Sequence, residues 1–88
     1  MGKVGVWLRL TTAEPNVDLE KIKEKLKDAC REIDAEVLEI REEPIAFGIY
    51  AIKMIIARDE ELGWGEKEEK KLKVEGISSV EVERVSLI

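Results

Sequence analysis

The sequence predicts an α+β fold in which two helices cover one face of a four-stranded antiparallel sheet. Four segments have the residue pattern of strands, and two segments with a helical repeat separate them in the order β-α-β-β-α-β. The length supports one sheet packed against one layer of helices, because 88 residues provide enough apolar side chains for only one core. We therefore treat residues 1–88 as one domain.

The first strand and the first helix have the clearest patterns. In residues 3–10 every second side chain is apolar, which is typical of a strand with one buried face: Val4, Val6, Leu8 and Leu10. Pro15 prevents continued pairing, and Asp18 is a suitable N-cap for a helix that runs to about Glu32. Cys30 lies beside the apolar face of this helix, so we expect it in the core. That face recurs at spacings of three and four: Leu19, Ile22, Leu26, Ala29 and Ile33.

The second and third strands differ in their exposure. Residues 35–42 alternate Leu38 and Ile40 with charged residues, which predicts a half-exposed edge strand that Pro44 and the two glutamates before it interrupt. Residues 47–57 are apolar at nearly every position, which predicts a central strand buried on both faces.

The last third of the chain predicts a loop, a short helix and a strand. The loop covers residues 58–65, and a helix at residues 66–74 offers only Leu72 and Val74 to a core, with Trp64 at its start and Gly76 to end it. Residues 79–88 form a strand with an irregularity near its end. Right-handed crossovers then place the first and third strands at the centre, which is the ferredoxin-like arrangement.

The composition excludes several classes of function. A net charge of −5 argues against direct nucleic-acid binding, which requires a concentrated basic surface. Without histidine and with one cysteine, the chain has no His-centred acid/base pair, no Cys/His zinc site and no internal disulfide. The sequence contains no run of 18 consecutive apolar residues, which a membrane-spanning helix would need, so we expect a cytoplasmic protein. Abundant Glu and Lys with one Asn and no Gln predict a melting temperature above about 65 °C.

The sequence also lacks the residues required for several functions that other proteins of this fold perform. One cysteine excludes a Cys-x-x-Cys metallochaperone, and the loop after the first strand has neither the arginine nor the glycines of a phosphate cradle. The paired acidic residues have no neighbours that complete a catalytic or metal site, so we expect solvated surface charge and no cofactor. An RNA-binding alternative would use Trp7 and Tyr50 as stacking residues on adjacent central strands.

One segment does not fit a simple structural role. An apolar stretch joins the second strand to the third where polar residues are usual, and it contains the only phenylalanine of the chain: Pro44, Ile45, Ala46, Phe47 and Gly48. Two interpretations are open. The segment is an interaction site, or Phe47 folds back over an edge of the core while Gly48 allows a positive φ.

The same segment, with the two glutamates before it and Ile49 after it, resembles the hallmark of the archaeal translation elongation factor 1-beta family. Other matching features cover almost the whole chain. They include the entry to the first helix from Pro15 to Glu20 and the run from Gly76 to Val82 into the last strand.

This resemblance implies a guanine-nucleotide exchange factor for elongation factor 1-alpha, acting as a monomer without cofactor, nucleic acid or membrane. It implies that Phe47 enters an apolar pocket of the GTPase, with Ile45 and Ala46 beside it. The C-terminal end, here Leu87 and Ile88, would approach the nucleotide and magnesium site. Eukaryotic members have a lysine where this chain has Leu87, so magnesium displacement by lysine does not transfer. The alternative is a ferredoxin-like regulatory or adaptor domain that binds a small ligand or self-associates.

Overall fold

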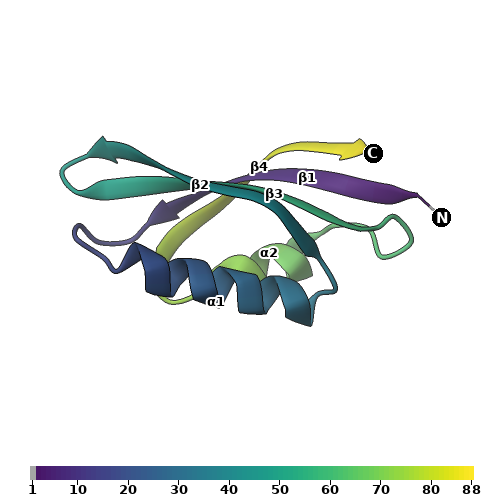
Figure 1. Cartoon of the computed structure of the whole chain (residues 1–88), viewed down its shortest axis with the longest axis horizontal. Coiled ribbons are helices and arrows are strands. Elements are labelled where there is room, and N and C mark those ends of the chain that lie inside the picture. The colour runs from purple at the N-terminus through teal and green to yellow at the C-terminus, as the bar shows by residue number, and fades with distance from the viewer. Residues whose placement is uncertain (1) are drawn as a thin grey trace.

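The computed structural model describes residues 2–88 and has the predicted order of elements. All strand pairs are antiparallel in the order β2-β3-β1-β4, and both helices lie against the same face of the sheet (Figure 1). The predicted ferredoxin-like α+β fold is therefore confirmed, including its central strands and its edge strand β2. The elements are β1 (Lys3–Thr12), α1 (Leu19–Glu32), β2 (Glu36–Ala46), β3 (Ile49–Asp59), α2 (Glu66–Leu72) and β4 (Ile77–Leu87).

The core lies between the sheet and the helices. The apolar faces predicted for β1 and α1 are buried, and Cys30 is fully enclosed as expected. Each large buried side chain contributes about 1.5–3 kcal/mol relative to exposure, so this layer supplies most of the favourable free energy of folding. The largest fully buried apolar side chains are Leu8, Leu10, Leu26, Ile52, Met54, Ile56 and Leu72.

The helices begin where the sequence indicates, but α2 ends earlier than predicted. Asp18 caps α1, since its Oδ1 accepts a hydrogen bond from Lys21 N at 3.2 Å. Helix α2 ends at Leu72 rather than at residue 74, and Gly76 lies beyond it in the turn before β4 with φ +98°. A Cβ at Gly76 would lie 3.0 Å from Ile22 Cδ1, so glycine is needed there for close packing on α1 as well as for its φ.

The predicted interruption of β2 at Glu42, Glu43 and Pro44 is wrong. The strand continues to Ala46, and Pro44 pairs with Tyr50 of β3. An edge strand tolerates proline because the missing N–H can face solvent instead of a neighbouring strand. As a result β2 and β3 form a long hairpin, and β3 begins at Ile49, after Phe47 and Gly48.

Two irregularities change which side chains face the core. Leu38 lies at a shift in register between β2 and β3 and is half-exposed, so Val37 joins Ile40 on the core side instead. The irregularity expected in β4 is present as a shift beside Trp7. It places Val85 and Leu87 on the same side of the sheet as Val82, while Arg84 points to the other side with Trp7.

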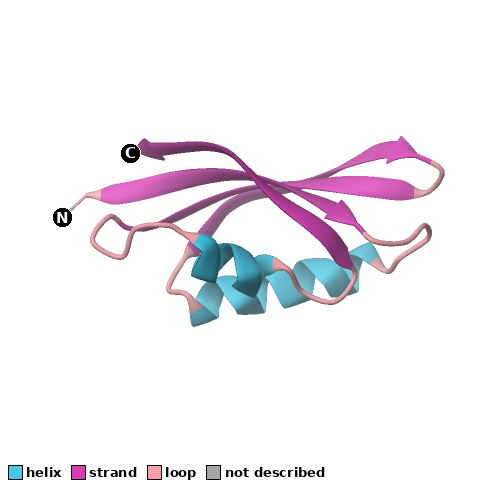
Figure 2. Cartoon of the chain, turned by 180° about the vertical axis from the view of Figure 1, so that it is seen from behind, coloured by secondary structure: helices cyan, strands magenta, loops and turns pink. Residues whose placement is uncertain are grey.

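The predicted burial of β3 on both faces is only partly correct. Ile52, Met54 and Ile56 are enclosed by the helices. On the opposite face, Ala51 and Ala57 are also buried, whereas Lys53 and Ile55 are only half-buried. The helices cover one face of the sheet only (Figure 2). On the other face, each side chain is shielded from solvent by the side chains of the neighbouring strands.

A mismatch in length determines which parts of the sheet remain uncovered. Eleven residues of β3 span about 35 Å at the rise of a strand, whereas the fourteen residues of α1 span about 21 Å. The sheet therefore extends past the helical layer at both ends, with the β2-β3 hairpin at one end and the two chain termini at the other (Figure 1). Within residues 2–88, neither helix has the length and apolarity needed to cross a membrane.

Candidate partner-binding site

The hairpin between β2 and β3 closes with the two-residue turn Phe47-Gly48. Both residues have positive φ, +52° for Phe47 and +79° for Gly48. This is the pattern of a type I′ turn, whose twist matches that of the flanking strands and whose preferred residues are Asn-Gly or Asp-Gly. Glycine adopts this conformation at little cost, but phenylalanine is unusual there because its Cβ crowds the backbone.

The backbone strain at Phe47 is not offset by burial of its side chain. Phe47 is 95% exposed, the highest value among the large exposed apolar residues of the described part of the chain, residues 2–88. The interpretation in which Phe47 folds back over the core is therefore wrong. A strained and exposed aromatic residue at the tip of a long hairpin is a candidate for contact with another molecule.

The loop between β1 and α1 braces the hairpin. Asn16 N donates to the carbonyl oxygen of Gly48 at 3.3 Å, and a Cβ at Gly48 would lie 3.0 Å from Cβ of Pro15. Nearby, Tyr50 N donates to the buried Oγ1 of Thr12 at 3.0 Å. Sequence reasoning missed these supports. Extending the alternation of Val4 to Leu10 by one step would have placed Thr12 on the core side, but no local pattern pairs Asn16 with a residue far along the chain.

The residues beside the turn extend its apolar surface. Ile45 is 48% exposed, and Pro44 and Ala46 are also exposed. Pro44 and Ile45 line a cavity of about 310 Å³ on the helix-free face of the sheet, together with charged residues that include Arg9 and Lys53. The five predicted hairpin residues therefore form one continuous tip.

The predicted C-terminal residues lie at the other end of the molecule. Leu87 is 68% exposed and Ile88 60% exposed. Ile88 N donates to the carbonyl oxygen of Lys3 at 2.9 Å, which fixes the end of β4 to the start of β1. The molecule measures 43 × 20 × 20 Å, and the hairpin and the termini occupy opposite ends of the sheet (Figure 1). The structure thus separates the predicted residues into two surfaces.

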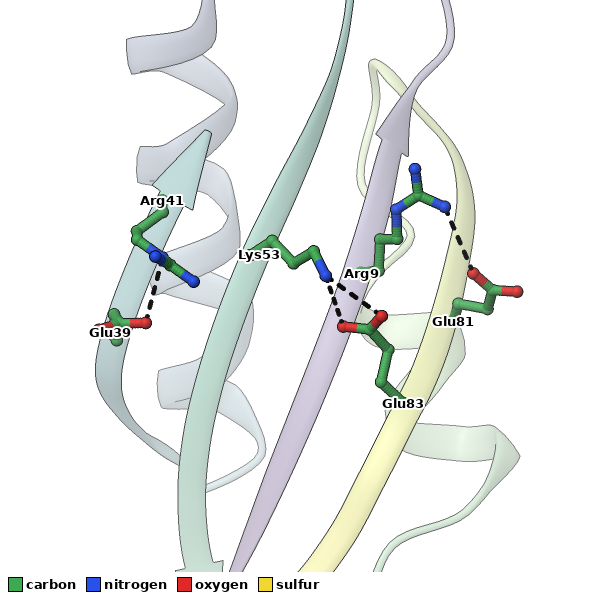
Figure 3. Close-up of polar contacts among 6 residues, drawn as sticks. All are labelled: Arg9, Glu39, Arg41, Lys53, Glu81 and Glu83. Carbon is green, nitrogen blue, oxygen red and sulfur yellow. Dashed lines mark hydrogen bonds and ion pairs between the residues drawn. The ribbon is translucent and has the colours of Figure 1, made fainter. Parts of the chain in front are cut away.

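Charged pairs cover the helix-free face between these ends (Figure 3). Lys53 Nζ reaches Glu83 across β1 at 3.1 Å, and Arg9 reaches Glu81 at 4.0 Å. The register places Trp7 opposite Ile55 on this face, whereas Tyr50 lies beside Thr12 on the helix side. The two aromatic residues of the RNA-binding alternative therefore lie on opposite faces and cannot form one stacking platform.

Residues 6–88 match the family model described as the EF-1 guanine nucleotide exchange domain. The chain belongs to this family. Its role is therefore nucleotide exchange in translation elongation.

Similar chains extend the match over the full length. "Elongation factor 1-beta" of Staphylothermus marinus is 41% identical, covering 100% of this chain and 99% of the relative. The protein of the same name from Methanocaldococcus jannaschii is 35% identical, with 99% of each covered. That from Pyrococcus horikoshii is 41% identical, covering 97% of this chain and 93% of the relative. The predicted archaeal elongation factor 1-beta family is thereby confirmed.

Solved structures support the fold alone. The C-terminal domain of MgtC from Mycobacterium tuberculosis superposes with a TM-score of 0.67 at 11% identity, covering 99% of this chain and 87% of that one. The ACT domain of GTP pyrophosphokinase from Chlorobium tepidum gives a TM-score of 0.61 at 16% identity, covering 91% and 97%. The exchange domain thus uses a widely shared architecture, and its function depends on particular residues.

In this exchange domain, the described residues hold few groups suited to chemistry. Residues 2–88 contain no cluster of acidic or cysteine side chains arranged to hold a metal ion. Burial raises the pKa of the Cys30 thiol to about 11, so the thiol stays protonated and enclosed by the core. The large exposed apolar residues of the hairpin tip and of the C-terminal end are Ile45, Phe47, Leu87 and Ile88.

Proposed function

We propose that this chain accelerates GDP release from elongation factor 1-alpha by binding the GTPase with both ends of its sheet. The observation that carries the proposal is Phe47, strained at φ +52° and 95% exposed on a braced hairpin. Membership in the exchange-domain family supports it. In this arrangement Phe47 is an anchor that enters an apolar pocket of the partner, and Gly48 lets the hairpin backbone approach closely.

The mechanism is thermodynamic linkage between two ligands of the GTPase. A protein that binds the nucleotide-free GTPase more tightly than the GDP-bound form must weaken GDP binding by the same factor. A hundredfold preference for the nucleotide-free form corresponds to about 2.7 kcal/mol. No covalent bond forms or breaks, so the role is one of binding, performed in the cytoplasm where translation elongation takes place.

The C-terminal end contributes an apolar contact rather than a charge. Leu87 stands where the resemblance implies a lysine in eukaryotic members. The basic residue nearest to it in the sequence is Arg84, whose guanidinium carbon lies 4.9 Å from the centre of the Trp7 ring on the other face. We therefore assign Leu87 and Ile88 the role of shaping the partner surface near the nucleotide by apolar contact.

The test is release of fluorescent GDP from the cognate elongation factor 1-alpha, with and without this protein. We expect faster release that saturates with protein concentration. The function is wrong if release is unchanged. Acceleration that persists undiminished in Phe47→Ala would leave exchange intact and remove the anchor. A self-associating or small-ligand regulatory domain would instead show an oligomer or a ligand-dependent melting shift.

A further inference from the structure

A second concave surface lies at the C-terminal end of the sheet, on the side that the helices cover elsewhere. It is a groove of about 520 Å³, which we call the terminal groove. The register puts Val85 and Leu87 of β4 opposite Val6 and Val4 of β1 on this side. The groove is lined by Val4, Glu60, Glu61, Gly63, Trp64, Val85 and Leu87.

The groove exists because β4 continues past the helices. Further back on the same side of β4, Val80 and Val82 pack against the core. Val85 is 51% exposed and Leu87 is 68% exposed, although both have the orientation of core residues. Only the loop between β3 and α2 covers this end of the sheet (Figure 2).

An ion pair holds one wall of the groove in place. Arg58, the β3 neighbour of Val4, is 6% exposed, and its Nη1 lies 3.0 Å from Oε2 of Glu68 in α2. Glu68 also accepts a hydrogen bond from Gly65 N at 2.9 Å. These contacts tie the start of α2 and the end of the preceding loop to the sheet beside the groove.

The charges around the groove are acidic. Glu60 and Glu61 begin the loop after β3 and line the groove, and Glu60 Oε1 accepts a hydrogen bond from Gly2 N at 3.2 Å. Within residues 2–88, the Glu61 carboxylate takes part in no ion pair. An apolar floor with carboxylates at its rim complements a side chain that has an aliphatic stem and a cationic head.

We propose that the terminal groove receives a lysine or arginine side chain of the GTPase, with its stem on Val85 and Leu87 and its charged head at Glu61. This inference rests on the proposed exchange function and specifies the contact at its second end. The two ends then engage the partner in opposite ways. The hairpin inserts Phe47 into the partner, and the terminal groove accepts a side chain from it.

Charge reversal tests the rim. Glu61→Lys should weaken association with elongation factor 1-alpha about tenfold at low salt, measured by surface plasmon resonance, and the loss should shrink as salt rises. Glu24→Lys is the matched control, because it makes the same change at an exposed position of α1 away from the groove. Equal losses in the two variants would overturn the proposal, since they would reflect net charge alone.

Filling the groove tests its floor. Val85→Arg places a cationic side chain of this chain where the partner's would bind, and we expect at least fivefold weaker association. Leu38→Arg is the control, since Leu38 is 49% exposed on the edge strand β2, close to the 51% of Val85. Equal behaviour of the two would reject the groove while wild-type exchange still stands. A wild-type protein without exchange activity would reject both proposals.

Discussion

The two ends of the sheet are uncovered for the same reason but present opposite shapes. Both extend past helix α1, because the strands are longer than the helix. At the hairpin end, the sheet narrows to two strands and a two-residue turn that exposes Phe47. At the C-terminal end, β4, β1 and the loop before α2 enclose the terminal groove. The hairpin end of the sheet therefore projects from the molecule, whereas the C-terminal end forms a recess.

The ends also differ in how their shape is maintained. The hairpin depends on backbone geometry, with two positive φ angles and a hydrogen bond from Asn16 to Gly48. The terminal groove depends on a side-chain ion pair between Arg58 and Glu68. Backbone substitutions should therefore affect the first end, and changes in charge or pH should affect the second.

The largest effect is expected when the aromatic ring is removed and the turn is improved. Phe47→Asn puts a residue suited to positive φ in the type I′ turn, so we expect a thermal midpoint at or above that of wild type. Association with elongation factor 1-alpha should weaken about 30-fold or more, which corresponds to the 2 kcal/mol typical of a buried aromatic anchor. Calorimetry and GDP release measure the two effects separately. A clear loss of stability would contradict the strain at Phe47.

A somewhat smaller effect is expected from Gly48→Ala. The substitution introduces strain at φ +79° and a Cβ contact of 3.0 Å with Pro15, so we expect a loss of about 1–2 kcal/mol in unfolding free energy. Gly63→Ala is the control, because Gly63 has φ +64° but no atom within 4 Å of the added Cβ. It should cost less. Equal losses in thermal unfolding would mean that Pro15 does not brace the hairpin.

The fold could be predicted from the sequence because its signals are local. Alternation in β1 and spacings of three and four in α1 follow from the geometry of a single element. The predicted C-terminal end of β2 was wrong although its edge position was predicted, because proline is compatible with an edge strand only where its missing N–H would face solvent. The direction of that N–H position depends on the register between β2 and β3, which no residue near Pro44 specifies.

The candidate site also has parts that the local sequence indicates and parts that depend on contacts between distant residues. The apolar tip around Phe47 was visible as a local anomaly in composition. The bracing by Asn16 joins residues 32 positions apart in the chain, and the terminal groove joins β1, β4 and the loop at residues 60–65. Such surfaces depend on register and on a bulge in β4, which no short sequence pattern specifies.

At the C-terminal end, truncation of an exposed leucine should have a moderate effect on binding only. Leu87→Ala should weaken association with the GTPase about fivefold, equivalent to about 1 kcal/mol, while thermal stability stays within about 0.5 kcal/mol because Leu87 is 68% exposed. Leu38→Ala, half-exposed on β2, should change neither quantity. A loss of stability in Leu87→Ala would place this side chain in the core rather than at an interface.

The smallest effect is expected from the pair that holds the groove. The Arg58 guanidinium, whose Nη1 lies 3.0 Å from Oε2 of Glu68, lowers the pKa of Glu68 below its usual range, so the proton binds more weakly in the folded state than in the unfolded state. The stabilisation is therefore fully present above the unfolded pKa of about 4.3 and is lost as pH falls through the folded pKa. Glu68→Gln keeps an acceptor for Arg58 but removes the charge, and should cost about 0.5 kcal/mol at pH 7.

Thermal unfolding of wild type and Glu68→Gln from pH 7 down to pH 2 measures this difference directly. The two midpoints should converge as the pH falls through the lowered pKa of folded Glu68, because wild-type Glu68 becomes neutral there as glutamine is at every pH. A gap that stays constant with pH would mean that glutamine disturbs packing rather than charge. Since the Phe47 turn contains no ionisable group, a hairpin variant such as Gly48→Ala should keep the same offset from wild type across this range. Convergence in Glu68→Gln alone would show that charge maintains only the C-terminal end.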